Sequence, residues 1–175
     1  HYRLAIHLTA AFTVFSLVLW TVLDIRLGRR AFAGDGTAVA RQARWLLALV
    51  LVQIVWGAFT AGLDAGRIYN TWPLMNGSFM PENVTAFGDW WFDLSHHRDG
   101  VQFVHRNLAW LVAAAVVAFA FVHRATPALA GMWQLLVGLV VLQFVLGVFA
   151  ILTQVNIALG VAHQFGALLL LAAVL

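Results

Sequence analysis

Three histidines lie within stretches that are otherwise almost wholly apolar: His7 in YRLAIHLTAAF, His105 in FVHRNLAW and His163 in LGVAHQFGALLL. Ionisable side chains are costly inside a bilayer, so their presence there points to a function. Residues three and four positions away share a helix face with each histidine, and half of them are alanine or glycine. Such a face leaves a flat slot beside a neutral imidazole, which suits axial ligation of heme iron. Hydrogen bonding between helices is the alternative role.

The composition places these histidines in a membrane. Of the 175 residues, 63% are hydrophobic and 10% are charged, against about 45–50% and about 25% in soluble domains. All ten basic residues are arginines that cluster between apolar stretches, which does not indicate nucleic-acid binding. The 175 residues include no cysteine, which excludes disulfides, thiolate catalysis and iron–sulfur or cysteine–zinc sites within them.

Helices must position the histidines, and a helix needs about 20 mostly apolar residues to span a bilayer. Five segments qualify: Leu4–Leu23, Trp45–Leu63, Val101–Val122, Met132–Thr153 and Ile157–Leu175. We therefore predict an all-α polytopic membrane protein with five transmembrane helices. We expect the last four to form a heme-binding four-helix bundle.

The charges of the connections predict how these helices are oriented. The connection 24–44 is rich in arginine and the one after residue 122 carries Arg124, whereas 64–100 is acidic. By the positive-inside rule the first two are cytoplasmic and the third is external. His7, His105 and His163 then come four, five and seven residues into spans that run inwards. At about 1.5 Å per residue, all three lie near the external face, where His105 and His163 could ligate one iron from both sides.

An internal repeat relates two of the spans. LVLVQIVWGAF (49–59) resembles LVVLQFVLGVF (139–149), with Gln53 matching Gln143 and Gly57 matching Gly147. Two equivalent helices, each followed by a partner span, are therefore expected. The glutamines are predicted to form hydrogen bonds between helices, and the glycines to permit close helix packing.

Arg106 follows His105 and lies about 100° further round the helix. Its guanidinium could pair with a heme propionate or extend to lipid headgroups, and the sequence leaves both roles open. Surface roles are expected for His96, His97 and His123, which lie in a connection or at a boundary.

The long connection contains the mixed stretch YNTWPLMNGSFMPENV. Its aromatic, Asn, Pro and Gly residues are typical of a folded cap that closes a site, although a loop that merely packs at the membrane interface fits the same pattern. Tyr69, Asn70 and Trp72 could contact a heme from this stretch.

Several motifs together resemble the heme A synthase family: GLDAGRIYNTWPLMNGSFMP (62–81), FVHRNLAW (103–110) and LGVAHQFGALLL (159–170). The similarity extends over essentially the whole chain. Members have eight spans in two similar four-helix halves, each with a histidine pair. The resemblance implies that residues 1–24 are a span of an otherwise missing N-terminal half and 25–44 an arginine-rich cytoplasmic linker. Residues 45–175 would be the C-terminal heme b bundle, with the external loop 64–100.

The resemblance also implies an oxidoreductase. Family members oxidise the methyl group of heme O to a formyl group, which makes heme A for terminal oxidases, in bacterial cell membranes or the mitochondrial inner membrane. His105 and His163 would then hold the iron of heme b, a cofactor that relays electrons to an unknown acceptor or quinone. His7 would be a catalytic-site residue, one axial ligand of the substrate heme iron. The implied partners are heme O, the heme O synthase and the lipid bilayer.

The sequence departs from the family pattern in two ways. An acidic residue and a further histidine of the first half cannot be located, so this chain alone is expected to bind heme b without turnover. The segment LSHHRDGVQ before His105 is also more charged than expected. Two other classes fit the histidines: a diheme b-type electron-transfer cytochrome, such as a quinol dehydrogenase subunit, and a transporter with a proton relay. The shared depth near one face counts against the transporter.

Overall fold

The structure is a computed structural model that describes residues 2–27, 37–129 and 131–175. Its long helices are α1 (Tyr2–Leu27), α2 (Ala38–Gly62), α4 (Arg98–Val122), α5 (Met132–Leu152) and α6 (Ile157–Val174). The shorter ones are α3 (Trp90–Ser95), η2 (Ala65–Arg67), η3 (Glu82–Thr85) and η4 (Pro127–Leu129). The prediction of an all-α integral membrane protein is confirmed, because all five long helices are long and apolar enough to cross a bilayer.

Capping side chains set two of the helix starts. α2 begins earlier than predicted because the Thr37 hydroxyl accepts a hydrogen bond from the Ala40 N–H at 3.2 Å. α6 begins at the predicted residue, where Asn156 Oδ1 accepts from the Ala158 N–H at 3.0 Å. Each cap satisfies backbone donors that have no partner within the first turn of a helix.

The arginine-rich connection is shorter than the predicted linker 25–44. α1 continues to Leu27, and Arg41 and Arg44 occupy exposed positions in the first turns of α2. Exposed arginines at a helix end can extend their charge away from the apolar region. Residues 28–36, with the predicted linker residues Arg29 and Arg30, lie outside the described part of the chain.

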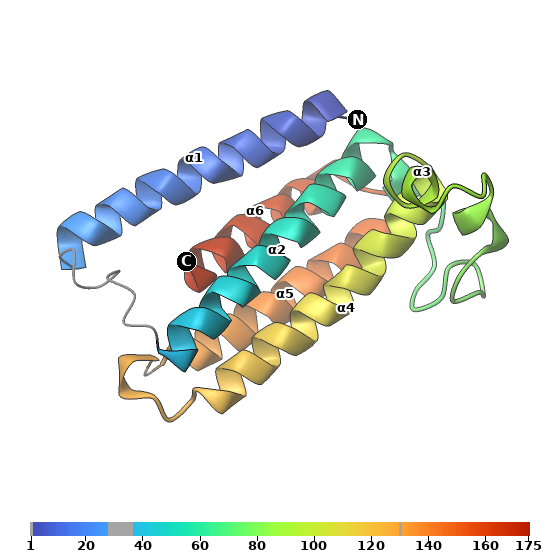
Figure 1. Ribbon diagram of the computed structural model, residues 1–175. Helices are drawn as coiled ribbons and strands as arrows, with labels where there is room; N and C mark the ends of the chain where they lie inside the picture. Colours follow the sequence, from blue (N-terminus) through green and yellow to red (C-terminus); the bar gives the residue numbers. More distant parts are fainter. Residues whose placement is uncertain (1, 28–36, 130) are drawn as a thin grey trace.

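The helices α2, α4, α5 and α6 form a bundle, in which α4 packs between α2 and α5 and α5 packs between α4 and α6 (Figure 1). All four contribute to one apolar core, made of Leu46, Val50, Val112, Val116, Ala120, Leu136, Val140, Leu170 and Leu171. Apolar side chains on the outward faces, such as Val161 and Phe165, are exposed. Lipid tails solvate such faces as well as a protein interior does.

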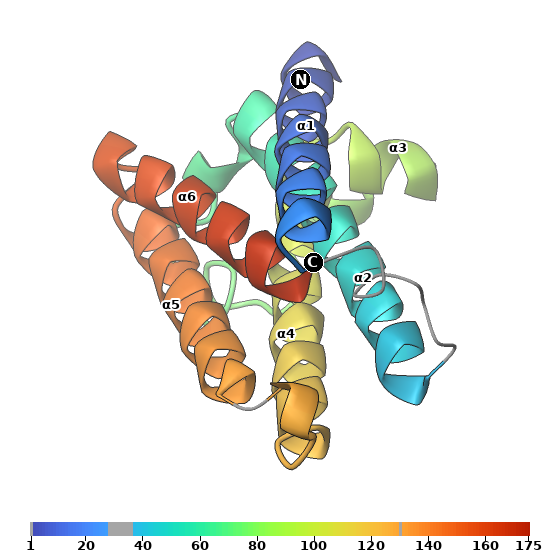
Figure 2. The same ribbon diagram turned by 90° about the vertical axis from the view of Figure 1, so that its left-hand side faces the viewer.

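The first helix lies against the outside of this bundle, along α2 and α6 (Figures 1 and 2). Ala5 and Phe12 are its buried side chains among those described, and Phe12 belongs to the core cluster. Apolar residues on the rest of α1, such as Leu17 and Ile25, are exposed. α1 is therefore held by a narrow stripe of contacts.

Residues 63–97, which we call the cap, fold over one end of the bundle (Figure 1). The cap has an interior of its own, with Ala65, Val84 and Asp93 fully buried and Met75 nearly so. Among its hydrogen bonds, three reach three different helices: Trp56 Nε1 donates to Leu94 O (3.1 Å), Gln102 Nε2 to Tyr69 O (3.0 Å) and Asn70 Nδ2 to Ile151 O (2.9 Å). The expected folded cap is thus present.

Candidate functional site

A cavity of about 290 Å³ lies among α2, α4, α5 and α6, beneath the cap. Its size is close to the lower end of the about 300–1,000 Å³ that is usual for ligand pockets. His105 of α4 and His163 of α6 both line it. The structure thus brings together the two histidines that the sequence predicted to act as a pair.

The internal repeat of the sequence reappears as a repeat of contacts. Gln53 Nε2 of α2 lies 3.2 Å from His105 Nδ1, and Gln143 Nε2 of α5 lies 3.4 Å from His163 Nε2. The predicted hydrogen bonds of the two glutamines between helices are confirmed. Each glutamine contacts the histidine of the next long helix, so α2 with α4 and α5 with α6 form equivalent pairs.

A glycine makes room for each histidine ring. A Cβ atom added at Gly57 would lie 3.1 Å from His105 Cε1, and one added at Gly147 would lie 2.9 Å from His163 Cε1. These glycines come four residues after the glutamines, on the same helix face. They permit close packing as predicted, but what they admit is an imidazole rather than the backbone of the neighbouring helix.

Each imidazole is hydrogen-bonded to the glutamine of the neighbouring helix. His163 Nδ1 lies 3.1 Å from the Gln143 carbonyl oxygen, which can only accept, so Nδ1 carries the proton and Nε2 keeps its lone pair. His105 Nδ1 faces the side-chain amide of Gln53, whose Nε2 also donates to the His105 carbonyl at 3.2 Å. The Oε1 atoms of both glutamines are buried and have no hydrogen-bond partner.

Small residues shape the cavity beside the histidines. Ala109, Gly160 and Ala167 line it, four residues after His105 and three before or four after His163. These are the positions that share a helix face with the imidazoles. The slot predicted from the sequence is therefore formed.

Arg106 clamps the cap onto α4. Its Nη2 donates to the carbonyl oxygens of Thr71 (3.0 Å) and Pro73 (2.9 Å). Its Nη1 is buried without a hydrogen-bond partner, and the residue lines the cavity. This clamp could not be inferred from the sequence, because nothing in the spacing shows where the cap folds back. The arginine is occupied by backbone carbonyls of the cap rather than extended to lipid headgroups.

Aromatic side chains meet where the cap reaches the cavity. Trp72 stacks on Trp110 with ring centroids 6.1 Å apart, and Trp110 packs on Phe144 at 4.5 Å. All three residues line the cavity. Tyr69 and Asn70, the other candidates from the same stretch, are not among its described lining residues. Trp72 is thus the cap residue of these three that a ligand could touch.

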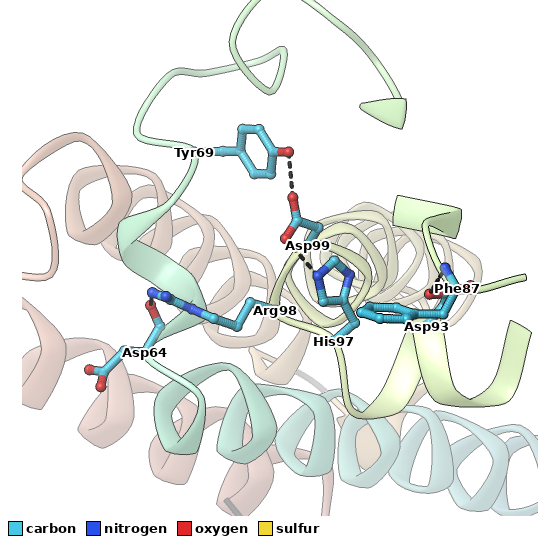
Figure 3. Close-up of polar contacts among 7 residues, drawn as sticks. All are labelled: Asp64, Tyr69, Phe87, Asp93, His97, Arg98 and Asp99. Atoms are coloured by element: carbon cyan, nitrogen blue, oxygen red, sulfur yellow. Dashed lines mark hydrogen bonds and ion pairs between the residues drawn. The ribbon is translucent and has the colours of Figure 1, made fainter. Parts of the chain in front are cut away.

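Tyr69 and Asn70 hold the cap instead. Tyr69 donates from its hydroxyl to Asp99 Oδ1 at 2.6 Å, and His97 Nε2 lies 3.4 Å from the other oxygen of Asp99 (Figure 3). Burial, together with the hydrogen bond to Asp99 and its negative charge, raises the pKa of Tyr69 to about 12. The charged approach to α4 therefore anchors the cap.

A second bond from that approach reaches the cap. Arg98 Nη2 donates to the Asp64 carbonyl at 2.9 Å (Figure 3). Both arginines near the start of α4 thus hold backbone carbonyls of the segment that precedes it, at different points along the cap.

The other histidines lie away from the cavity. His7 is exposed on α1 and is not among the described residues that line it. His123 is half-buried at the end of α4, with Nε2 2.6 Å from Gln42 Oε1. His96 and His97 are half-buried in the cap, where His96 contacts the Tyr2 hydroxyl as well as Ser95 Oγ, so they are more integrated than predicted.

These residues fit a heme between His105 and His163. The Gln143 carbonyl accepts the Nδ1 proton of His163, so the lone pair of its Nε2 is available. Metal-bound histidines usually have such an acceptor at the other ring nitrogen. Small residues flank both rings, and the Arg106 Nη1 is a buried cation donor without a partner. A propionate would supply the missing acceptor.

Comparisons with known proteins agree with this site. A family model described as "COX15-CtaA: Cytochrome oxidase assembly protein" matches residues 1–175. The protein named heme A synthase of Maricaulis maris is 43% identical over 175 residues, which are 97% of this chain and 50% of that protein. That of Rhizorhabdus wittichii is 43% identical over 178 residues, 100% of this chain and 50% of that protein. The chain thus spans about half the length of these relatives, and no solved structure matches it.

Proposed function

Since the chain belongs to the COX15-CtaA family of cytochrome oxidase assembly proteins, we propose that it is the heme b-binding half of a heme A synthase. The whole enzyme would oxidise the methyl group of heme O to the formyl group of heme A. The observation that carries the proposal is that His105 and His163 line one cavity and that each ring packs against a glycine of the neighbouring helix. Relatives that share 34–43% of its residues bear the name heme A synthase.

Four residues of the cavity have a defined task in this proposal. His105 of α4 and His163 of α6 would hold the heme iron, and Arg106 Nη1 would bind a propionate while Nη2 keeps the cap in place. Trp72, with the aromatic side chains packed on it, keeps water from the end of the cavity beneath the cap. When bound, heme b supplies one-electron chemistry that connects the substrate to an external acceptor or quinone.

His7 is proposed to serve a different heme. It is exposed on α1, outside the described lining of the cavity, so any heme that it binds lies on another face of the helix. We assign it as an axial ligand of the substrate heme, in a site completed by residues beyond this chain. Heme O, delivered by a heme O synthase, would be the partner at that site.

Location follows from the same assignment. The cap lies at the end of α4 that carries His105, and the acidic connection is expected to be external. The heme b site would then lie towards the external face of a bacterial cell membrane or the mitochondrial inner membrane.

Heme analysis of the full-length protein tests the proposal. The protein would be produced with a supply of heme O, and its extracted hemes would be identified by mass. Heme b together with heme A is the expected result. Alanine at His105 or His163 should remove heme b, whereas His123→Ala, at the end of α4 away from the cap, should keep it. Heme b alone in the wild type would favour an electron-transfer cytochrome, and no heme at all would overturn the assignment of the cavity.

A further inference from the structure

Two polar side chains of α4 lie where the cap meets the cavity. We propose that Gln102 and Arg106 form one carboxylate site: Arg106 binds a heme propionate directly, and Gln102 binds it through one water molecule. Occupation of this site stabilises the contact between the cap and α4. The inference rests on the proposed function, because the heme supplies the carboxylate. It gives a task to Gln102 and makes the cap respond to the cofactor.

Gln102 contacts the cap and also lines the cavity. The residue is 1% exposed, and its Nε2 donates to the Tyr69 carbonyl oxygen at 3.0 Å. A carbonyl oxygen only accepts, so this bond fixes the orientation of the amide and leaves Oε1 as an acceptor. Oε1 is buried without a hydrogen-bond partner among the described residues, and Gln102 lines the cavity. A donor in the cavity would complete the bonding of this side chain.

Arg106 is divided between the cap and the cavity in the same way. Its Nη2 donates to the carbonyl oxygens of Thr71 and Pro73, at 3.0 and 2.9 Å. Its Nη1 is buried with no partner in the described part of the chain, and the residue lines the cavity. Residues four positions apart share a helix face, so the two unpaired atoms belong to neighbouring side chains. One is a cationic donor and the other a neutral acceptor.

This pair of atoms favours a carboxylate together with water. A guanidinium donor pairs best with an anion, and a carboxylate matches its planar geometry. An amide oxygen cannot bond to a carboxylate directly, because both groups only accept. One water molecule has two hydrogens, so it can donate to Gln102 Oε1 and to the carboxylate at once. Both buried atoms are then paired, which removes the cost of leaving them unsatisfied.

The same two residues connect this site to the cap, because each bonds a cap carbonyl with one polar atom and has another that is unpaired. When the cap is open, solvent can reach both side chains and pair their polar atoms. When the cap is closed, a ligand in the cavity must pair them. A ligand that binds the closed form better shifts the equilibrium towards that form. By reciprocity, a closed cap holds the ligand more tightly.

Hydrogen exchange in the cap measures this coupling. The full-length protein would be purified in detergent with heme b bound, and a second sample would be depleted of heme by transfer to an acceptor globin. The exchange rate of segment 71–76 without heme is divided by the rate with heme. Bonds to charged groups are among the stronger ones, so the wild-type ratio should be about tenfold or more. In Gln102→Leu the ratio should fall about threefold or more, because one neutral bond is lost.

Tyr69→Phe is the matched control. It removes the hydroxyl that donates to Asp99 Oδ1 at 2.6 Å, a bond that holds the cap outside the described lining of the cavity (Figure 3). Exchange in segment 71–76 should become faster in both samples, but the ratio should keep its wild-type value. A purely structural role of Gln102 would produce this same pattern, so the ratio separates the two roles.

Gln102→Glu provides a second test if Gln102→Leu does not yield folded protein. The side chain keeps its length, but its carboxylate repels the propionate that Arg106 binds. The ratio should therefore fall below the wild-type value in this variant as well.

The outcomes separate the inference from the proposed function. A wild-type protein without heme b would overturn the proposed function. A wild-type protein that binds heme b, but whose cap exchanges equally fast with and without it, would overturn the coupling alone. Gln102 variants that keep the wild-type ratio would overturn the role of Gln102 and leave the heme site in place.

Discussion

Single residues decide how closely the cavity holds its histidines. His105 and His163 were found from the sequence because an ionisable group in an apolar span is conspicuous. Their partners Gln53 and Gln143 were expected to bond between helices, but not to a named residue. Which residue they meet depends on how each helix is rotated about its axis. Spans that are apolar all round carry little information about that rotation.

The packing of His163 on Gly147 can be tested by adding one methyl group at position 147. In Gly147→Ala the new Cβ would lie 2.9 Å from His163 Cε1, so the ring or the helix must move. We expect most of the bound heme b to be lost and a destabilisation of about 1–3 kcal/mol. Heme absorbance per protein and the thermal unfolding midpoint are the measurements. Gly138→Ala, on the same helix with nothing within 4 Å of its Cβ, should keep full heme content.

The anchor of the cap has a pH signature. The pKa of Tyr69 is raised from 10.0 to about 12, so the folded state favours the neutral phenol. The resulting stability is complete below pH 10 and is lost as the pH rises towards 12. A tyrosinate absorbance titration should show the late-titrating group in the wild type and not in Tyr69→Phe. A wild-type titration that shows no group later than those of Tyr69→Phe would contradict this anchor.

At the scale of elements, hydropathy predicted the five spans well, because their length is fixed by bilayer thickness. The cap was less predictable. Its folding depends on bonds such as those from Arg106 to Thr71 and Pro73, which join residues more than thirty positions apart. No periodic pattern encodes such contacts in an irregular segment. The sequence thus indicated a folded cap without indicating what fastens it.

The clamp between α4 and the cap predicts a local effect. Arg106→Gln removes the Nη2 group that donates to two carbonyl oxygens, because the glutamine side chain is shorter and uncharged. Hydrogen exchange in segment 71–76 should become at least about tenfold faster, which corresponds to about 1.4 kcal/mol of local opening free energy. Arg124→Gln is the control, because that guanidinium bonds within its own helix end, to Phe121 O. Equal exchange in both variants would refute the clamp.

At the scale of the whole molecule, α1 and the bundle share one interior. Phe12 belongs to the core cluster and, with Leu8, lines the cavity. The first helix therefore closes part of the cavity wall, although little of its surface is buried. The sequence suggested a helix that belongs to a separate half. The structure shows in addition that this helix packs on the bundle.

The contribution of α1 can be measured through Phe12. Phe12→Ala removes a ring that is 7% exposed, and comparable substitutions in protein cores cost about 3–5 kcal/mol. We expect a lower unfolding free energy in detergent–denaturant titrations and faster release of heme b. Leu17→Ala, on the exposed face of the same helix, should change stability by less than about 0.5 kcal/mol. If the two variants are equally stable, α1 does not close the cavity.

The two helix pairs have very different connections. Residues 153–156 join α5 to α6, whereas the whole cap, residues 63–97, lies between α2 and α4. Both pairs nevertheless hold a histidine over a glycine. The packing of each histidine on its glycine therefore depends on the helices and not on the length of the connection between them. For protein engineering, we expect that the connection within a pair can be shortened or can carry an inserted domain while the histidine stays packed on its glycine.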